Sequence, residues 1–384
     1  HWLSVERPQA IGPDQTFWWN TSGHTLHPML FHARYPVWDR YSSLRFFAES
    51  IVPYLGPARL SGEGVARWQS FMTDDGIPVE LSWDWGSGKQ QPKIRLSVEP
   101  VGPSAGIEVD PLNQWAVAQF HHYTIMRNPR SDFAWYTHFS DIFRGKDATI
   151  ALTKTEGHLS QIFYAFDLDR SSTMAKAYFF PKWLAYHCNA PAWNVISAAI
   201  KTAPSCNSEN LQVLSVLDGF FNESYGRRLE FEMLSTDLLR PATARLKIYF
   251  RSRDVSISSV EHIMSIRGVI LSHSLKKGIR NIRRLCSLLV SSNGILEEFL
   301  DSTAHRTSGL LYYASFRLGD AIPSIKLYIP VRHFVSDDES VRKAVEEFLV
   351  EQGKAQRVQQ YVLLTVLYSL YLVFVSTYPI EILL

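Results

Sequence analysis

Short alternating runs that come in pairs constrain the fold of this chain more than any other feature. Eight runs alternate apolar and polar side chains between Gly, Pro, Ser and Asp turn residues, as half-buried β-strands do. They span residues 79–85, 93–99, 161–168, 174–180, 228–235, 244–250, 309–316 and 324–330. Helical periodicity appears at 41–55, 208–221, 274–300 and 338–352. The pattern predicts a repeated unit of helix followed by two strands.

The second strand of each pair carries a basic residue, and these residues recur at a regular interval. They are Arg95, Lys176, Lys247 and Lys326, which lie 81, 71 and 79 residues apart (95 to 176, 176 to 247, 247 to 326). Units of this length, each with an antiparallel strand pair, close naturally into one barrel with a ring of helices outside. No linker divides the chain, so we expect a single domain over residues 1–384, with residues 355–384 as its atypical end.

The strands are predicted to carry cations on one face and apolar side chains on the other. In ARLKIYF, Arg245, Lys247 and Tyr249 share one face because side chains alternate along a strand. The arrangement recurs at Arg95, at Lys176 with Tyr178, and at Lys326 with Tyr328. If helices cover the apolar faces, the cations point inward and need a compensating anion. A diphosphate is such an anion; a sheet with a solvated basic face is the alternative interpretation.

The tyrosines and one acidic residue indicate the chemistry that would accompany a diphosphate. Heterolysis of an allylic diphosphate generates a carbocation, which ring faces stabilise while they exclude water. Glu80, in VELSWDW, would accept a hydrogen bond from an indole N–H or phenol O–H and so raise the nucleophilicity of that ring. Packing tyrosines and a solvated strand glutamate are the alternatives.

Composition excludes several classes of protein. Lys and Arg number 39 and Asp and Glu 37, so the net charge is 39 − 37 = +2, which gives no long-range field for nucleic acid. Cys188, Cys206 and Cys286 are odd in number and far apart, which argues against disulfides and zinc and favours the reduced cytoplasm. No D-D-x-x-D motif occurs, which argues against the metal-dependent prenyl synthases, and we expect neither a metal nor another cofactor.

The run from Tyr361 to Ile380 contains twenty residues without a charge. Its length makes it a transmembrane candidate. Its content of Val, Tyr, Thr and Phe and its place in the repeat favour two further strands, so we expect no membrane partner.

Seven motifs resemble, in order and spacing, the fungal dimethylallyl-tryptophan-synthase family of aromatic prenyltransferases. They are DQTFWWNTSG, GIPVELSWDW, IRLSVEPVG, AGIEVDPLN, AKAYFFP, ARLKIYFRS and KLYIPVRHF, within residues 14 to 353. The resemblance implies an α+β fold called the ABBA barrel, with about ten antiparallel strands closed around a solvent-filled lumen. It also implies transfer of a prenyl group, without Mg²⁺, from its diphosphate to an indole or phenolic acceptor in fungal secondary metabolism. We expect a monomer or homodimer.

The resemblance also implies roles for individual residues. Glu80 falls on the glutamate that orients the acceptor. The positions that match diphosphate ligands are Arg95, Lys176, Arg245, Lys247 and Lys326. The positions that match the tyrosine shield of the carbocation are Tyr178, Tyr249, Tyr328 and Tyr361, with Tyr371 as a further candidate.

Two positions depart from the family pattern. Members that use tryptophan carry an arginine thirteen residues before the arginine of the RLKIY motif, where it binds the substrate carboxylate. Here that position, counted back from Arg245, is Glu232. An acceptor without a carboxylate is therefore favoured. The last strand of the family also carries a doubled tyrosine, which the ending LVFVSTYPIEILL lacks. An incompletely closed barrel is therefore an alternative to the complete one.

Three other motifs do not support a function. Gly102 to Gly106 matches the G-x-S-x-G elbow of hydrolases, but no helix follows directly, and Gly86 to Lys89 lacks most of a phosphate loop. His24, His27 and His32 have no Cys or carboxylate partner in the sequence around them. The alternative to a prenyltransferase is an inactive barrel homologue or a membrane-tethered binding protein.

Overall fold

The structure, a computed structural model, describes residues 12–58, 68–73, 76–84, 91–144, 158–169, 173–289, 305–355 and 357–358. All eight predicted strands are present, in one sheet whose strand order follows the sequence from β1 to β8. The chain divides into two compact units. The first comprises residues 1–86, 90–206 and 233–246, and the second 87–89, 207–232 and 247–384. The prediction of one domain stays a prediction.

The first unit combines four whole strands and most of a fifth with the N-terminal helices. Its strands are β1 (Val79–Asp84), β2 (Lys93–Val98), β3 (Ile162–Leu168) and β4 (Thr173–Phe179). Its helices are α1 (Pro13–Trp18), α2 (His24–His32), α3 (Val37–Phe46), α4 (Gln114–Phe120), α5 (Ala134–Phe143), α7 (Lys182–His187) and α8 (Ala192–Lys201). The predicted helix 41–55 begins earlier, and after Phe46 it widens into a π-turn (Phe47–Ile51) and then tightens into a 3₁₀-turn (Val52–Tyr54) that contains Pro53.

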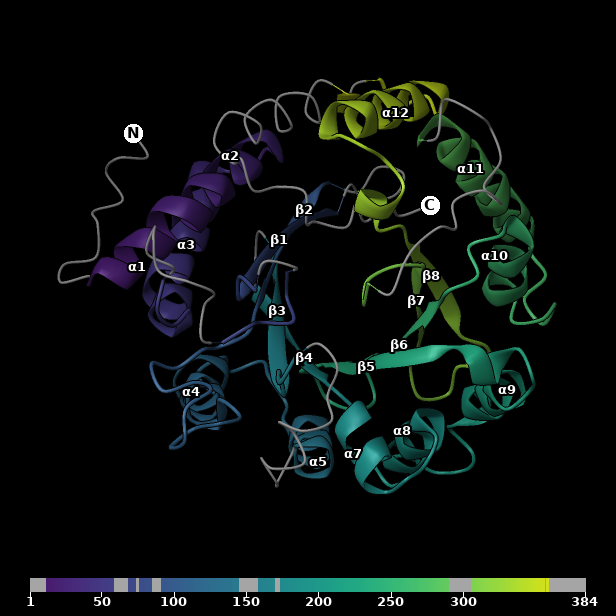
Figure 1. The fold of residues 1–384 in the computed structure, drawn as a ribbon, viewed down its shortest axis with the longest axis horizontal. Helices are drawn as coiled ribbons and strands as arrows, with labels where there is room; N and C mark the ends of the chain where they lie inside the picture. Colours follow the sequence, from purple (N-terminus) through teal and green to yellow (C-terminus); the bar gives the residue numbers. More distant parts are fainter. Residues whose placement is uncertain are drawn as a thin grey trace. The chain divides into compact units, whose positions relative to one another are not determined.

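The strands of the first unit pair antiparallel in a register that fixes which side chains share a face. Consecutive pairs from β1 to β4 are antiparallel, and β4 pairs in the same sense with β5 (Glu230–Asp237). Phe166 packs against Phe46 of α3 and Phe120 of α4, and Phe179 packs against Phe139 of α5. Helices of this unit therefore cover the apolar face, as the sequence predicts (Figure 1). Side chains alternate along a strand, so the polar residues of these strands lie on the opposite face.

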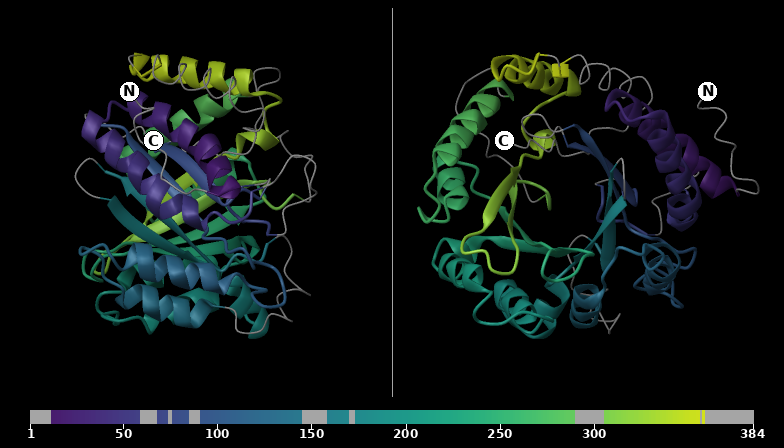
Figure 2. Two further views of the ribbon diagram at one scale, coloured as in Figure 1. Left: turned by 90° about the vertical axis from the view of Figure 1, so that its left-hand side faces the viewer. Right: turned by 180° about the vertical axis from the view of Figure 1, so that it is seen from behind.

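The second unit contains the later strands and four helices. Its strands are most of β6 (Leu246–Ser252), β7 (Leu310–Phe316) and β8 (Ser324–Tyr328). Its helices are α9 (Gln212–Phe221), α10 (Ile257–Met264), α11 (His273–Leu289) and α12 (Asp338–Glu351). The neighbouring helices α11 and α12 lie side by side (Figures 1 and 2) and are joined by ion pairs from Arg284 to Glu347 and Glu351.

The strands β5 and β6 each begin two residues later than the sequence predicts. The chain forms a short 3₁₀-turn at Gly226–Arg228 directly after α9. Gly226 approaches the backbone of Phe220 so closely that a Cβ would collide with it. Only glycine fits this turn, and the turn delays the start of β5.

Candidate active site

Three strands of the first unit bring two predicted cations together around one carboxylate. Arg95 of β2 donates from Nε to Asp167 Oδ1 of β3 at 2.7 Å, and Lys176 of β4 donates from Nζ to the same oxygen at 2.7 Å. The side chain of Lys176 is 1% exposed and that of Asp167 is 6% exposed. The antiparallel register places Asp167 directly opposite Arg95 and diagonally from Lys176, whose own partner Ala165 lies two residues from Asp167. One oxygen of Asp167 therefore bridges both cations.

A second carboxylate lies on the other side of Lys176. Asp237 of β5 is the direct cross-strand partner of Lys176, and its oxygens accept hydrogen bonds from Arg245 at 2.8 and 3.4 Å. The three predicted cations of this unit are thus accompanied by two aspartates, and the cluster carries a net charge of 3 − 2 = +1. The sequence analysis assigned the compensating charge to a diphosphate alone. The structure corrects this, because the protein supplies most of it and so holds the cations in place.

The buried charges shift their proton affinities. Burial first, and then the nearby Arg95 guanidinium, lower the pKa of Lys176 to about 8, against the opposing attraction of Asp167. Burial alone would raise the pKa of Asp167, but Lys176 and Arg95 lower it well below its ordinary value. The Asp167 carboxylate therefore stays charged at neutral pH. Lys176 also stays protonated, but its pKa lies closer to neutral pH than that of an exposed lysine.

Glu80 lies on the same sheet face, but away from this cluster. Direct cross-strand pairing runs from Glu80 to Ser97, then to Ala165 and then to Lys176. Three interstrand steps separate the Cα atoms of Glu80 and Lys176 by about 14 Å. The two residues between them, Ser97 and Ala165, are small and buried.

Tyr178 faces the same side two residues along β4 from Lys176. Its ring stacks on Phe163 of β3 with centroids 4.2 Å apart and an interplanar angle of 13°. The ring is 6% exposed. Tyr178 thus shares a strand face with Lys176, and its role as a shield stays a prediction.

The second unit repeats the association of cations with tyrosines. Tyr249, Tyr313 and Tyr328 form a triad with centroids 5.2 to 6.4 Å apart. The ammonium groups of Lys247 and Lys326 each lie 5.8 Å from the centroid of Tyr313, and Lys326 lies 5.3 Å from that of Tyr328. Both lysines are therefore positioned over ring faces that attract a cation.

The structure shows which predicted residues meet and which residues the sequence analysis missed. Arg95 and Lys176 meet through Asp167, and Lys247 and Lys326 meet over Tyr313, whereas Tyr361 lies outside the described residues. Asp167, Asp237 and Tyr313 were missed. The sequence could have indicated Asp167, because it lies two residues from Ala165 and therefore on the same strand face as the partner of Lys176. The sequence could not indicate which ring of the doubled Tyr312-Tyr313 lies on the face with the lysines.

A buried carboxyl group outside these clusters gives a prediction about stability. Glu99 is 1% exposed and accepts hydrogen bonds from Trp68 at 3.1 Å, Ser70 at 2.5 Å and Ser160 at 2.8 Å. Burial raises its pKa from 4.5 to about 7, although these donors partly oppose the shift.

We expect the free energy of unfolding to fall as pH rises from about 4.5 to about 7, because the folded state binds the Glu99 proton more tightly than the unfolded chain does. The difference corresponds to about 3 kcal/mol. Urea unfolding of the wild type and of Glu99→Gln at pH 5 and pH 8 measures it. The variant should lose this part of the pH dependence, and an equal dependence in both proteins would contradict the assignment.

The motifs set aside in the sequence carry no site in the described residues. Ser104 lies in a turn followed by further turns rather than by a helix, so it forms no hydrolase elbow. Within the described ranges no group of three His, Cys, Asp or Glu residues is placed to hold a metal ion. The three cysteines are free thiols. None of the helices in this part of the chain combines the length and apolarity needed to cross a lipid bilayer, and the run 361–380 lies outside it.

An antiparallel sheet with helices on its apolar face, and with cations and tyrosines on its polar face, defines an α+β protein. Comparison with known proteins identifies the family. The profile of the tryptophan dimethylallyltransferase family matches residues 14–363. The chain belongs to this family, and it is a prenyltransferase of the fungal aromatic type.

Individual relatives support the assignment. The chain is 32% identical to 4-O-dimethylallyl-L-tyrosine synthase of Claviceps purpurea, with 88% of this chain and 76% of that protein covered. It is 31% identical to 7-dimethylallyltryptophan synthase of Aspergillus fumigatus, with 88% and 74% covered. Among solved structures, the crystal structure of AnaPT from Neosartorya fischeri superimposes with a TM-score of 0.79 at 24% identity, with 94% of this chain and 86% of that chain covered.

Proposed function

We propose that this chain transfers a prenyl group, dimethylallyl or longer, from its diphosphate to the ring of an indole or phenolic acceptor. The carbon–oxygen bond of the prenyl diphosphate breaks, and the diphosphate leaves with the electron pair. The acceptor ring then attacks the allylic carbocation, and the attacked atom loses its proton. The observation that carries this proposal is the placement of two lysines over tyrosine faces, Lys247 over Tyr313 and Lys326 over Tyr313 and Tyr328. Lys176 and Tyr178 likewise share one face of β4.

The cations are proposed to bind and stabilise the departing diphosphate. The five residues are Arg95, Lys176, Arg245, Lys247 and Lys326. Asp167 and Asp237 support three of them by fixing their positions, because each aspartate accepts hydrogen bonds from guanidinium or ammonium groups. Groups held in place before the reaction stabilise developing charge without reorganising. Tyr178, Tyr249 and Tyr328 are proposed to shield the carbocation. Tyr313 joins them because its ring contacts the other two tyrosines of its unit and lies 5.8 Å from both lysines.

Several finer expectations belong to this proposal. Glu80 is proposed to accept a hydrogen bond from the acceptor ring. Two further strands from the run 361–380, which lies outside the described residues, would complete the ten-stranded barrel of the family. The protein is proposed to act in the cytoplasm as a monomer or homodimer.

The names of relatives support the range of acceptors. They are described as enzymes for L-tyrosine, for tryptophan and, at 28% identity, for a xanthone in Emericella nidulans. The crystal structure of NotF holds brevianamide F and DMSPP, which are an acceptor and a prenyl donor analogue, and it superimposes with a TM-score of 0.80. Mass spectrometry of products from indoles and phenols incubated with C5, C10 and C15 diphosphates tests the function. Absence of any product would favour an inactive homologue.

We expect prenyl transfer to persist in EDTA, because protein cations take the role that Mg²⁺ has in metal-dependent enzymes. The measurement compares initial rates in the purified protein with and without chelator. Loss of activity that Mg²⁺ restores would contradict the proposed diphosphate site.

A further inference from the structure

Helix α11 of the second unit is strongly basic. Its 17 residues contain five Lys and Arg and no Asp or Glu, so its formal charge is 5 − 0 = +5. The residues on one face are buried in the core of the unit: Ile279, Ile282, Leu285, Cys286 and Leu289. The basic residues are all exposed: Lys276, Lys277, Arg280, Arg283 and Arg284. The helix therefore packs through its apolar face and turns its charged face outward.

Neighbouring helices neutralise only the C-terminal half of this charged face. Arg283 pairs with Glu261 of α10 at 3.1 Å. Arg284 pairs with Glu347 and Glu351 of α12. In the N-terminal half, three cations form no ion pair with the residues that the structure describes: Lys276, Lys277 and Arg280. The packing of the helices thus leaves this half of the face charged.

The chain after α12 adds a fourth cation to this half. Burial first, and then repulsion from Arg357 and Lys277, lower the pKa of Lys354, so Lys354 lies close to Lys277. Lys276 and Lys277 in turn each lie one helical turn from Arg280. These cations form one cluster, the basic patch: Lys276, Lys277, Arg280 and Lys354.

Exposed aliphatic side chains border the basic patch. Val269 and Leu271 directly precede α11 and are 48% and 80% exposed. Val350, in the last turn of α12, is 55% exposed. Cations beside exposed aliphatic groups match the headgroup layer of a membrane, which offers both negative charge and an apolar interior. The described residues around the patch include no exposed Phe, Tyr or Trp on which a nucleic-acid base could stack.

We propose that the basic patch, with Leu271 at its edge, docks this protein on the surface of a membrane that contains anionic phospholipids. The four cations pair with phosphate and carboxylate groups of the lipid headgroups, and Leu271 enters the interfacial layer. Because α11 keeps its apolar face in the core, attraction between charges dominates the binding and the protein stays peripheral. This revises the expectation of no membrane partner, which considered only a spanning segment.

Vesicle sedimentation with the purified chain tests the proposal without requiring turnover, so its outcome is independent of the proposed prenyl transfer. We expect binding to vesicles of phosphatidylcholine that contain about one third phosphatidylserine, and none to phosphatidylcholine alone. Raising NaCl from about 0.1 M to about 0.5 M should release the protein, because salt screens the charges. Equal binding to both kinds of vesicle, or none to the anionic vesicles, would overturn the proposal.

The double variant Lys276→Gln/Lys277→Gln should bind the anionic vesicles about 10- to 30-fold more weakly. Each basic residue near an anionic surface contributes about fivefold to the affinity. Both positions are exposed and glutamine is a good helix former, so the fold should survive, which thermal unfolding checks. Unchanged binding in this variant would contradict the role of the patch.

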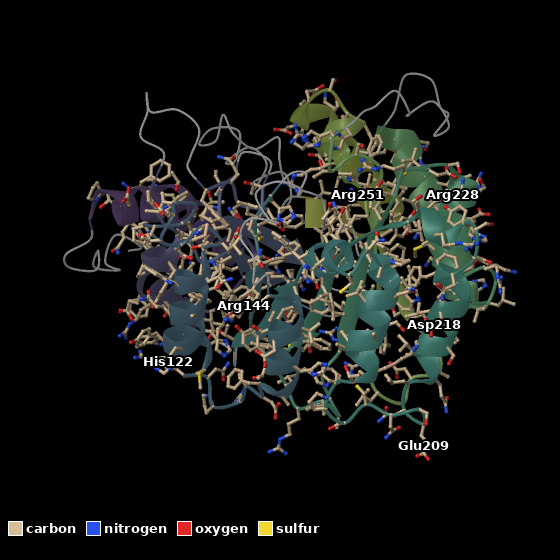
Figure 3. All side chains as sticks on the ribbon, turned by 60° about the horizontal axis from the view of Figure 1, so that its bottom comes forward. His122, Arg144, Glu209, Asp218, Arg228 and Arg251 are labelled. Atoms are coloured by element: carbon tan, nitrogen blue, oxygen red, sulfur yellow. The ribbon has the colours of Figure 1, made fainter. Side chains whose placement is uncertain are left out.

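The matched control is Arg227→Gln/Arg228→Gln, which removes the same amount of charge from exposed positions of the same unit. Arg228 (labelled in Figure 3) lies 4.9 Å from the ring centroid of Tyr225, in the turn after α9. Figure 1 shows α10 between α9 and α11. The control should bind like the wild type.

Equal weakening in both double variants would mean that the net charge of the chain, rather than the basic patch, governs binding, and would overturn the proposal. RNA and an acidic peptide are titrated in parallel without vesicles. Binding of either at the patch, with no binding to anionic vesicles, would likewise overturn it.

Discussion

Replacement of Glu80 by glutamine is expected to lower the rate of prenyl transfer about 30- to 150-fold, while hydrolysis of the prenyl diphosphate to the alcohol falls much less. Glutamine keeps the shape and one acceptor oxygen but removes the negative charge, and a hydrogen bond to a charged group contributes about 2 to 3 kcal/mol. Ionisation of the diphosphate depends on cations and tyrosines that the substitution leaves in place. Water therefore still traps the carbocation when the acceptor ring is poorly oriented.

The ratio of prenyl alcohol to prenylated product measures this effect. Asp84→Asn is the matched control, because Asp84 lies on the same face of β1 four residues further along and pairs across the strands with Lys93. If Glu80→Gln depressed both reactions equally, Glu80 would act on the diphosphate or on the fold. If it changed neither, the acceptor would be held elsewhere.

Replacement of Lys176 or Lys247 by alanine is expected to lower the turnover number for prenyl transfer about 10- to 150-fold. Each lysine contributes a charge-assisted contact to the departing diphosphate, worth about 1.5 to 3 kcal/mol. The fold should survive the loss of Lys176, because Asp167 retains its hydrogen bond from Arg95 at 2.7 Å. Steady-state kinetics with a saturating acceptor, together with thermal unfolding, provide the measurement.

Lys93→Ala is the control for these two variants. Lys93 shares its strand face with Arg95, but its side chain is 35% exposed and pairs with Asp169 at the surface. Turnover and stability should stay close to those of the wild type. Unchanged turnover in Lys176→Ala and Lys247→Ala, with normal unfolding, would mean that the basic face is an ordinary polar surface of a sheet.

The alternation of side chains along short strands determined the positions of the strands and the chemical character of their faces, without any knowledge of tertiary contacts. A strand has a period of two, so the letters of ARLKIYF are enough to place Lys247 and Tyr249 on one face and Leu246, Ile248 and Phe250 on the other. All eight predicted strands form, and helices pack against Phe166 and Phe179 on the apolar face. The family resemblance, which rested on local motifs of the same strands, is confirmed by the match over residues 14–363.

Only the tertiary structure decided which residues complete the clusters. Asp167 and Asp237 reach Lys176 from neighbouring strands, and Arg251 reaches Glu232 although nineteen residues separate them in the chain. The register of the strands decides which side chains contact one another across the sheet. Register depends on turns and on the packing of the apolar face, so the alternation within a single strand does not specify it. Tyr313 faces the lysines and Tyr312 the core because pairing with β8 aligns Tyr313 with Lys326. The sequence by itself therefore determined the chemical character of each face, whereas the pairing of strands determined which charges share a partner.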